Sequence, residues 1–163
     1  MSNVHQYDVV VIGSGAAGLT LALALAEKAN VAIISKSQLS EGSTYYAQGG
    51  IAAVLDATDS VDAHCADTLV AGAGLCHEDA VRFTVERSKK AIEWLIEQGV
   101  AFTREKKQDP KTGDLYDESG NDYHLAREGG HSSRRIIHAA DATGKAVSET
   151  LVERLHENPS IQP

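Results

Sequence analysis

The sequence is short of positive charge, of cysteine and of long apolar runs, and each shortage excludes a class of function. Its 163 residues carry 15 Lys and Arg against 23 Asp and Glu, which gives a formal net charge of −8. No stripe of basic side chains is therefore available to neutralise the phosphates of a nucleic acid. Binding to DNA or RNA is not expected.

The two cysteines, Cys65 and Cys76, form no CxxC pair. Neither a disulfide framework nor a zinc knuckle is indicated, and free thiols fit a reducing compartment. The apolar run at residues 18–26 (GLTLALALA) follows a glycine loop and is too short to span a bilayer. With 42% apolar residues in a chain the size of one domain, the sequence predicts a soluble, cytoplasmic protein without a membrane segment.

The start of the chain has the pattern of a βαβ unit. Residues 7–12 (YDVVVI) are typical of a strand buried in a parallel sheet, and GSGAAG follows at residues 13–18. An alanine- and leucine-rich helix to about residue 29 then leads to a second strand at residues 31–35 (VAIIS). This order predicts the α/β class, a Rossmann-like parallel sheet with helices on both faces.

The glycines of GSGAAG have the GxGxxG spacing of a dinucleotide site. Gly13 allows a tight turn, Gly15 lets the backbone approach a pyrophosphate, and Gly18 lets helix and strand pack closely. The N–H groups at the start of the helix would face the phosphates. The position between a strand and a helix favours a dinucleotide site over a turn that serves packing alone.

An acidic residue is missing from the end of the second strand, where many NAD and FAD proteins bind the ribose hydroxyls. The chain reads ISKS there, with Lys36 in third place. A lysine could pair with the 2′-phosphate of NADP, lie along an adenosine ribose, or be a solvated loop residue. This position alone does not separate NADP from FAD.

The loop STYYAQGG at residues 43–50 favours a flavin. The polar edge of a flavin ring needs several hydrogen-bonding groups. Gly49 and Gly50 permit close backbone approach, Ser43 and Thr44 could reach phosphate or ribose, and Gln48 could bond a ring edge. The alternative is a glycine-rich turn with two surface tyrosines.

The middle of the chain predicts helical scaffold. Ser60 suits the N-cap of a helix that Gly72 and Gly74 end. Residues 78–87 and 88–98 predict a pair of helices with apolar side chains at core spacing.

The last third begins with a polar excursion. Residues 103–123 contain the turn-forming pairs DP and TG and predict an exposed hairpin or flap. Residues 143–156 have apolar side chains on one helical face, and residues 158–163 (NPSIQP) are typical of the start of another strand. An ending at that point suggests a piece of a longer protein.

Five segments carry a resemblance to a known family. They are YDVVVIGSGAAGL, SEGSTYYAQGGIAAV, DTLVAGAGLC, AIEWLIEQGV and REGGHSSRRIIHAADATG. Together they resemble the N-terminal part of the L-aspartate oxidase family, within the succinate dehydrogenase and fumarate reductase flavoprotein superfamily. The resemblance covers residues 7–156, and residues 103–123 are its least familiar part.

The resemblance implies that residues 1–163 are the N-terminal part of an FAD-binding domain, incomplete at its C-terminal side, without the capping and C-terminal helical domains. The full-length enzyme would use FAD to oxidise L-aspartate to iminoaspartate, with oxygen or fumarate as electron acceptor. The product would feed quinolinate synthase on the route to NAD. The family's arginine and histidines for carboxylate binding and proton transfer are expected beyond residue 163, so no catalytic residue is assigned and the chain alone is expected to be inactive.

The resemblance also assigns cofactor residues. It implies that residues 14–17 hold the FAD pyrophosphate, that Lys36 lies by the adenosine and that residues 43–50 surround the flavin. Where succinate dehydrogenases have a histidine that carries a covalent flavin, this chain has Ser43, so FAD is expected to be bound non-covalently. The complete predicted set is Gly13, Ser14, Gly15, Ala16, Ala17, Gly18, Lys36, Ser43, Thr44, Tyr45, Tyr46, Ala47, Gln48, Gly49 and Gly50.

Glu128 is the predicted substrate residue. Dicarboxylate-oxidising relatives read like RPFGG where this chain has AREGG. A carboxylate can accept a charge-assisted hydrogen bond from the ammonium group that L-aspartate has and succinate lacks. The alternative is that Glu128 forms a surface ion pair with Arg127 or Arg134.

The remaining polar residues near Glu128 carry weaker expectations. His124, His131 and His138 are spaced by seven, but no Cys or acidic pattern accompanies them, so no metal site is predicted. Arg134 and Arg135 could attract a dicarboxylate or the cofactor phosphates. Asp141 and Thr143 are expected to cap the helix that follows.

Three other functions stay open on the sequence alone. A fumarate reductase or succinate dehydrogenase relative is disfavoured by Ser43 and Glu128. An NADP-dependent reductase is kept open by Lys36. A non-catalytic nucleotide-binding or interaction domain is the third.

Overall fold

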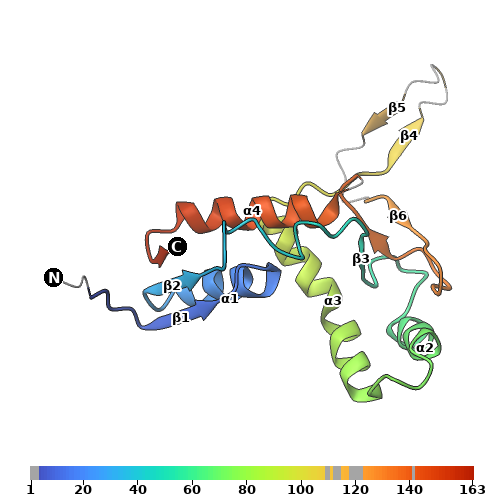
Figure 1. Cartoon of the computed structure of the whole chain (residues 1–163). Coiled ribbons are helices and arrows are strands. Elements are labelled where there is room, and N and C mark those ends of the chain that lie inside the picture. The colour runs from blue at the N-terminus through green and yellow to red at the C-terminus, as the bar shows by residue number, and fades with distance from the viewer. Residues whose placement is uncertain (1–3, 109–110, 112–114, 118–122, 141) are drawn as a thin grey trace. The chain divides into compact units, whose positions relative to one another are not determined.

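The computed structural model describes residues 4–108, 111, 115–117, 123–140 and 142–163. The chain forms two compact units (Figure 1). Unit 1 holds residues 1–48, 98–100 and 144–163, and unit 2 holds residues 49–97 and 101–143. Among the described residues no helix is both long and apolar enough to cross a membrane.

The predicted βαβ unit opens unit 1. β1 (Val9–Ile12) is followed by α1 (Ala16–Ala26) and β2 (Val31–Ile34). β1 and β2 pair in parallel, from Val9 opposite Val31 to Ile12 opposite Ile34. Parallel strands need such a crossover because a tight turn cannot join them. The α/β class with a parallel sheet is confirmed.

The end of the chain completes this sheet. β8 (Ile161–Gln162) pairs in parallel with β2 and gives the strand order β1-β2-β8, so the predicted final strand is confirmed. The preceding helix, α4 (Thr143–Glu157), is also confirmed. Its predicted apolar face is buried at Val147, Leu151 and Leu155.

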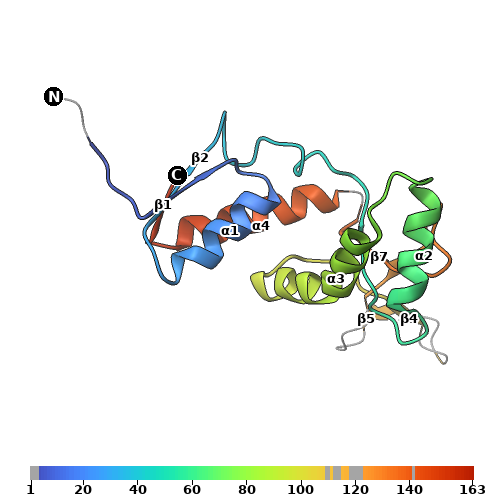
Figure 2. The same cartoon turned by 90° about the horizontal axis from the view of Figure 1, so that it is seen from below.

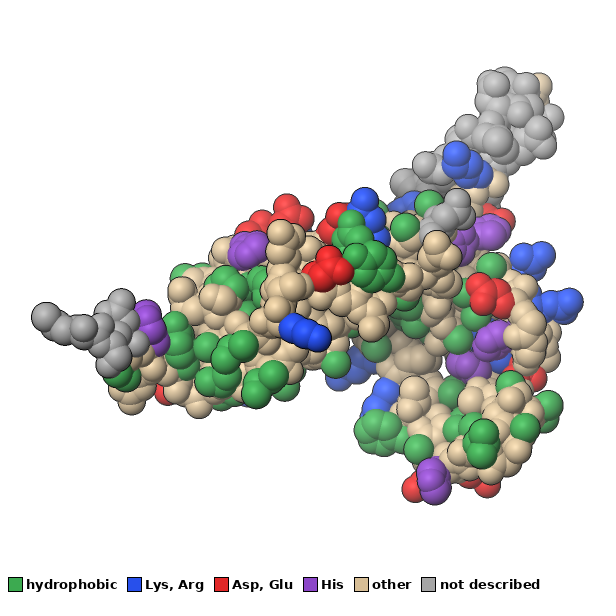
Figure 3. All heavy atoms as spheres, in the orientation of Figure 1, with side chains coloured by type: hydrophobic (Ala, Val, Ile, Leu, Met, Phe, Trp, Pro, Cys, Tyr) green, Lys and Arg blue, Asp and Glu red, His purple; other side chains and the backbone are tan. Residues whose placement is uncertain are grey.

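Only one face of the parallel sheet is covered. Val11, Val31 and Ile33 share a face and are buried, whereas Val10 and Ile12 on the opposite face are 51% and 86% exposed. Figure 2 shows α1 and α4 on the same side of the strands, and Figure 3 shows apolar side chains at the surface over β1 and β2.

Among the described residues of unit 1, both helices thus lie on one face of the sheet. The sheet order gives the reason. The chain moves in one direction from β1 to β2 to β8, and right-handed crossovers in one direction place their helices on one face.

The helices of unit 2 partly follow the prediction. α2 (Val61–Ala71) begins at the predicted N-cap, where Ser60 Oγ accepts a hydrogen bond from the Ala63 N–H at 3.1 Å. The predicted pair at 78–98 is wrong, because α3 (Glu78–Gln98) is one continuous helix. Ser88 does not break it, since its hydroxyl donates to the Val85 carbonyl at 2.7 Å within the helix.

The strands of unit 2 are antiparallel. β3 (Ile51–Ala52), β7 (Ile136–Ile137) and β6 (Leu125–Ala126) form a sheet in that order. Within the polar excursion, β4 (Lys106–Gln108) pairs with β5 (Leu115–Asp117), which is a hairpin arrangement. The DP and TG pairs of the predicted turns lie outside the described residues.

Candidate functional site

The loop after β1 has the geometry that phosphate binding needs. Gly13 has φ +110°, and its N–H donates to the Ile34 carbonyl at 2.8 Å, which fixes the turn beside β2. A Cβ on Gly18 would lie 1.9 Å from the Gly13 carbonyl oxygen, so close packing of helix and loop requires this glycine. Gly15 is the N-cap of α1, and the first turn has no acidic residue to repel an anion.

Thr44 joins the second predicted stretch to this loop. Its Oγ1 accepts a hydrogen bond from the Ala16 N–H at 3.0 Å, although the two residues are 28 positions apart. A Cβ on Gly15 would approach the same hydroxyl oxygen to 3.4 Å. The structure therefore brings the start of STYYAQGG to the start of α1.

The rest of residues 43–48 presents polar groups to solvent. Ser43 and Gln48 are exposed, and so is Ala47. The rings of Tyr45 and Tyr46 meet edge to face, with centroids 5.3 Å apart. The Tyr46 hydroxyl donates to Glu41 at 2.7 Å, and this hydrogen bond to a carboxylate raises the pKa of Tyr46.

Gly49 and Gly50 belong to unit 2, and they differ from each other. A Cβ on Gly50 would lie 2.4 Å from the Ile137 carbonyl oxygen, so Gly50 serves packing against β7. A Cβ on Gly49 would meet no atom within 4 Å. Of the predicted pair, Gly49 is the one whose backbone has open space beside it.

Gly144, which the sequence analysis did not assign to the site, holds the loop at residues 44–47 in place. Its N–H donates to the Ala47 carbonyl at 2.9 Å. A Cβ at this position would lie 1.9 Å from the Thr44 carbonyl oxygen. The sequence held one indication, a glycine in the first turn of a helix, where its propensity is poor.

A hollow of about 620 Å³ lies at the carboxyl end of β2. Its lining includes Ser35, Ser37 and Gln38, and the intervening Lys36 is exposed. Rossmann folds receive the ribose of a dinucleotide at this end of the second strand. This is where the resemblance places the adenosine, and the role of Lys36 beside it stays a prediction.

These features of unit 1 fit FAD. The open glycine turn and the helix start suit a pyrophosphate, the hollow beside Lys36 suits the adenosine, and the exposed loop at 43–48 offers polar groups. The residues that would hold the cofactor are therefore present in one compact unit, apart from Gly49 and Gly50.

Glu128 lies on the loop between β6 and β7 in unit 2. The His131 N–H donates to the Glu128 carbonyl at 3.2 Å, and Gly130 has φ +84°, as the third position of a type II turn requires. The Glu128 carboxylate is exposed and forms no ion pair with any residue that the structure describes. Arg134 instead donates to the Leu125 carbonyl at 3.3 Å, which leaves Glu128 free for a ligand.

Arg135 is not available to a substrate or a cofactor, which corrects the expectation for this residue. Its side chain is fully buried, and its Nε and Nη2 donate to the two carboxylate oxygens of Asp59, both at 2.8 Å. Its Nη1 donates to Asp67 at 2.7 Å. The guanidinium is therefore paired with two carboxylates inside unit 2.

Asp67 accepts further hydrogen bonds from the Glu128 loop. The N–H and the hydroxyl of Ser132 both donate to its Oδ2 at 2.7 Å. The backbone N–H of Ser132, more than any other group, lowers the pKa of Asp67 to about 2. Sequence reasoning missed Asp59 and Asp67, because isolated acids on the surface of a predicted helix or loop give no indication of a buried partner.

The three evenly spaced histidines do not form one cluster. His124 Nδ1 and His138 Nε2 are 2.8 Å apart, whereas His131 lies beside Arg135 and, at 5.7 Å between ring centroids, His64. No group of three or more His, Cys, Asp or Glu able to hold a metal occurs among the described residues.

Thr143 does not cap α4 as expected. It is the first residue of the helix, and its hydroxyl accepts a hydrogen bond from the Ala139 N–H at 3.1 Å. It therefore fixes the turn that precedes α4. Asp141, the other predicted cap, lies outside the described residues.

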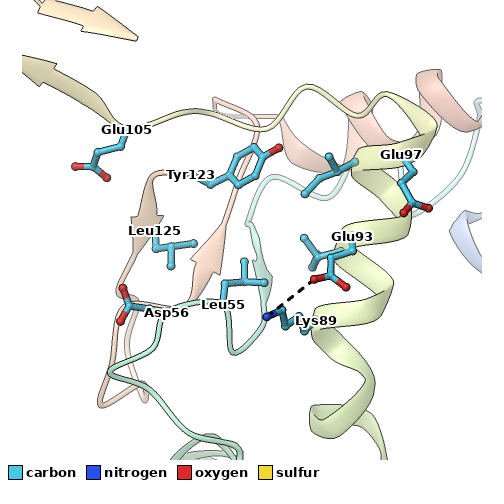
Figure 4. A pocket seen from close by; sticks show the side chains of 10 residues that line it. Leu55, Asp56, Lys89, Glu93, Glu97, Glu105, Tyr123 and Leu125 are labelled. Atoms are coloured by element: carbon cyan, nitrogen blue, oxygen red, sulfur yellow. Dashed lines mark ion pairs between the residues drawn. The ribbon is translucent and has the colours of Figure 1, made fainter. Parts of the chain in front are cut away.

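A separate cavity of about 550 Å³ in unit 2 is acidic (Figure 4). Its lining includes the carboxylates of Asp56, Glu93, Glu97 and Glu105. Lys89, the one basic residue among the described residues of the lining, lies 4.0 Å from Glu93. Such a lining repels a pyrophosphate or a dicarboxylate. This cavity suits neither the cofactor nor the proposed substrate.

The sequence of the chain is similar to those of known FAD-binding proteins. A family model described as FAD binding domain matches residues 8–162. The L-aspartate oxidase of Pseudomonas aeruginosa is 60% identical to the chain over 162 residues, which cover 99% of this chain and 29% of that protein. The corresponding enzyme of Vibrio cholerae is 53% identical over 96% of this chain and 28% of its own length.

A solved structure shows the same fold. A mutant quinol fumarate reductase of E. coli superposes with a TM-score of 0.82 and 32% identity, and the match covers 99% of this chain and 26% of that one. The chain thus spans less than a third of the length of each of these three relatives.

Proposed function

Because the chain belongs to the family of FAD-binding domains, we propose that it is the cofactor-binding part of an L-aspartate oxidase. The observation that carries the proposal is the 60% identity to the P. aeruginosa enzyme over 99% of this chain. The match to an FAD-binding domain favours FAD over NADP as the dinucleotide at this turn, which counts against the NADP-dependent reductase that Lys36 kept open. It also makes a non-catalytic interaction domain the weaker hypothesis.

In the proposed reaction, L-aspartate loses a hydride from its α-carbon and a proton from its nitrogen and becomes iminoaspartate. Bound FAD supplies the hydride acceptor, and oxygen or fumarate then takes up the two electrons. Quinolinate synthase is the proposed consumer of iminoaspartate, on the route to NAD.

Within this chain, the turn at residues 13–18 binds the pyrophosphate with backbone N–H groups at the start of α1. Thr44 orients this start through its bond to the Ala16 N–H, and Lys36 lies by the adenosine. Residues 43–50 surround the flavin end of the cofactor. Ser43 cannot form a histidyl link to the flavin, so the cofactor is bound non-covalently.

Glu128 recognises the substrate amine in this proposal. Its carboxylate is exposed and unpaired among the described residues, so it can accept a charge-assisted hydrogen bond from an ammonium group. Succinate has no such group and would gain nothing from this contact. Glu128 therefore favours L-aspartate over unsubstituted dicarboxylates.

A fumarate reductase or succinate dehydrogenase activity is the second candidate, and the match to quinol fumarate reductase favours it. The test is an anaerobic titration of the full-length flavoprotein. L-aspartate is expected to bleach the flavin absorbance at about 450 nm, and succinate is not. Bleaching by succinate but not by L-aspartate would establish the second candidate instead.

A further inference from the structure

One side chain of α2 forms two hydrogen bonds to the loop that carries Glu128. Asp67, on α2, accepts the N–H and the hydroxyl of Ser132 on the same oxygen, both at 2.7 Å. Ser132 directly follows the turn whose closing bond joins His131 to Glu128. The attachment point is therefore next to the turn that Glu128 begins, inside the loop between β6 and β7.

The position of Asp67 is itself fixed. Arg135 Nη1 donates to the same Asp67 oxygen at 2.7 Å, and the other side of the guanidinium forms two bonds of 2.8 Å to Asp59. Arg135 is fully buried, and the Asp59 side chain is 1% exposed. The two-bond pair of Arg135 and Asp59 has one favoured geometry, which holds the guanidinium in place. Asp67, which accepts a hydrogen bond from this guanidinium, therefore has little freedom to move.

We propose that Asp67 is a positioning residue for substrate binding: it sets the Glu128 loop so that the Glu128 carboxylate meets the substrate ammonium group. The inference rests on the role of Glu128 proposed above. Without the bonds to Asp67, the loop would lose its two hydrogen bonds to α2 and keep only weaker contacts there, such as that between the rings of His131 and His64. A carboxylate displaced by about 1 Å makes a much weaker bond to its ligand.

The proposal predicts a specific kinetic change. Glu128 contacts the ammonium group before and during the reaction, so a misplaced loop weakens binding of substrate and transition state alike. The KM for L-aspartate is then expected to rise while kcat stays within about twofold. Succinate lacks the ammonium group, so its inhibition constant is expected to change by less than about twofold. A purely structural role of Asp67 would instead reduce the flavin content. It would also shift the KM for L-aspartate and the inhibition constant of succinate together.

The experiment uses the full-length flavin-loaded enzyme. Asp67→Asn removes the charge that holds Ser132 and is expected to raise the KM for L-aspartate about tenfold, because hydrogen bonds to charged groups have that strength. Ser132→Ala removes the hydroxyl bond alone and is expected to raise it severalfold. The control is Asp62→Asn, an exposed aspartate of the same helix that pairs with Arg82 at 2.8 Å and is expected to leave KM unchanged.

A double-mutant cycle decides whether Asp67 acts through Glu128. Glu128→Gln alone is expected to raise the KM, and adding Asp67→Asn to it is expected to change the KM by less than about twofold. If the KM of the double variant instead rose by the product of the two single effects, the inference would be overturned and the role of Glu128 would stand. A Glu128→Gln enzyme with unchanged KM would overturn both.

Two other results count against the inference alone. One is a Ser132→Ala enzyme with full flavin content and unchanged KM, which also decides the matter if Asp67→Asn does not fold. The other is an inhibition constant for succinate that rises in parallel with the KM for L-aspartate.

Discussion

At the scale of single residues, the loop at 43–48 is shaped as much by its neighbours as by its own polar groups. Thr44 binds the Ala16 N–H through its side chain, and its own carbonyl oxygen lies where a Cβ on Gly144 would be. The loop is therefore held between the starts of α1 and α4. Its approach to the phosphate turn depends on a glycine that is one hundred residues further along the chain.

Gly144→Ala is expected to lower the free energy of unfolding by about 1–3 kcal/mol and to weaken FAD binding. Alanine has the better helix propensity, but the added Cβ would lie 1.9 Å from a backbone oxygen, which cannot move as a side chain can. Urea denaturation and flavin content measure the two effects. Gly42→Ala is the control, because a Cβ there meets no atom within 4 Å, and equal stability of the two variants would contradict the prediction.

At the scale of elements, α3 shows that apolar spacing does not define where a helix ends. Residues 78–87 and 88–98 each have a core face, so two helices and one helix fit the pattern equally well. The hydroxyl of Ser88 bonds the Val85 carbonyl inside the helix, and neither glycine nor proline occurs between 78 and 98. One helix follows.

Ser88→Pro separates the two interpretations. In the middle of a continuous helix a proline is expected to cost about 3 kcal/mol of folding free energy, whereas at the first position of a second helix it would be tolerated. The loss is measured by urea denaturation against Ser88→Ala, which removes only the hydroxyl. A stable Ser88→Pro chain would show that the helix breaks at this residue.

The bond between α2 and the Glu128 loop predicts a pH dependence. The folded pKa of Asp67, about 2, lies below its ordinary value of 3.8, so the charged carboxylate stabilises the fold above pH 3.8. This contribution is lost as the pH falls from 3.8 towards 2. The stability difference between wild type and Asp67→Asn is therefore expected at pH 6 and absent near pH 2. A difference that stays constant over this range, in urea titrations at each pH, would contradict the assignment.

At the scale of the whole molecule, the chain has two compact units and a parallel sheet with one covered face. Val11 and Ile12 are neighbours in β1 but are 5% and 86% exposed. The other face is also apolar, and Val10 and Ile34 on it are 51% and 54% exposed. The stability of unit 1 thus comes from one side of its sheet.

Matched substitutions measure this difference. Val11→Thr puts a hydroxyl into the core and is expected to cost about 1–3 kcal/mol, whereas Ile12→Thr is expected to change the stability of this chain by less than about 0.5 kcal/mol. Urea denaturation of the two variants compares the two faces. Equal losses would show that the second face is also covered.

The sequence by itself determined the βαβ start, the glycine turn, the N-cap at Ser60 and the family, because each depends on neighbouring residues or on a local pattern. It predicted residues 43–50 as a flavin loop from their composition and from the family resemblance, and it predicted the substrate role of Glu128 through the resemblance; those roles stay predictions. The tertiary structure alone decided that Arg135 is occupied by Asp59 and Asp67, that Gly144 holds Thr44 and that one face of the sheet is bare. Each of these depends on contacts between residues far apart in the chain or on the direction of a crossover, which local patterns do not encode.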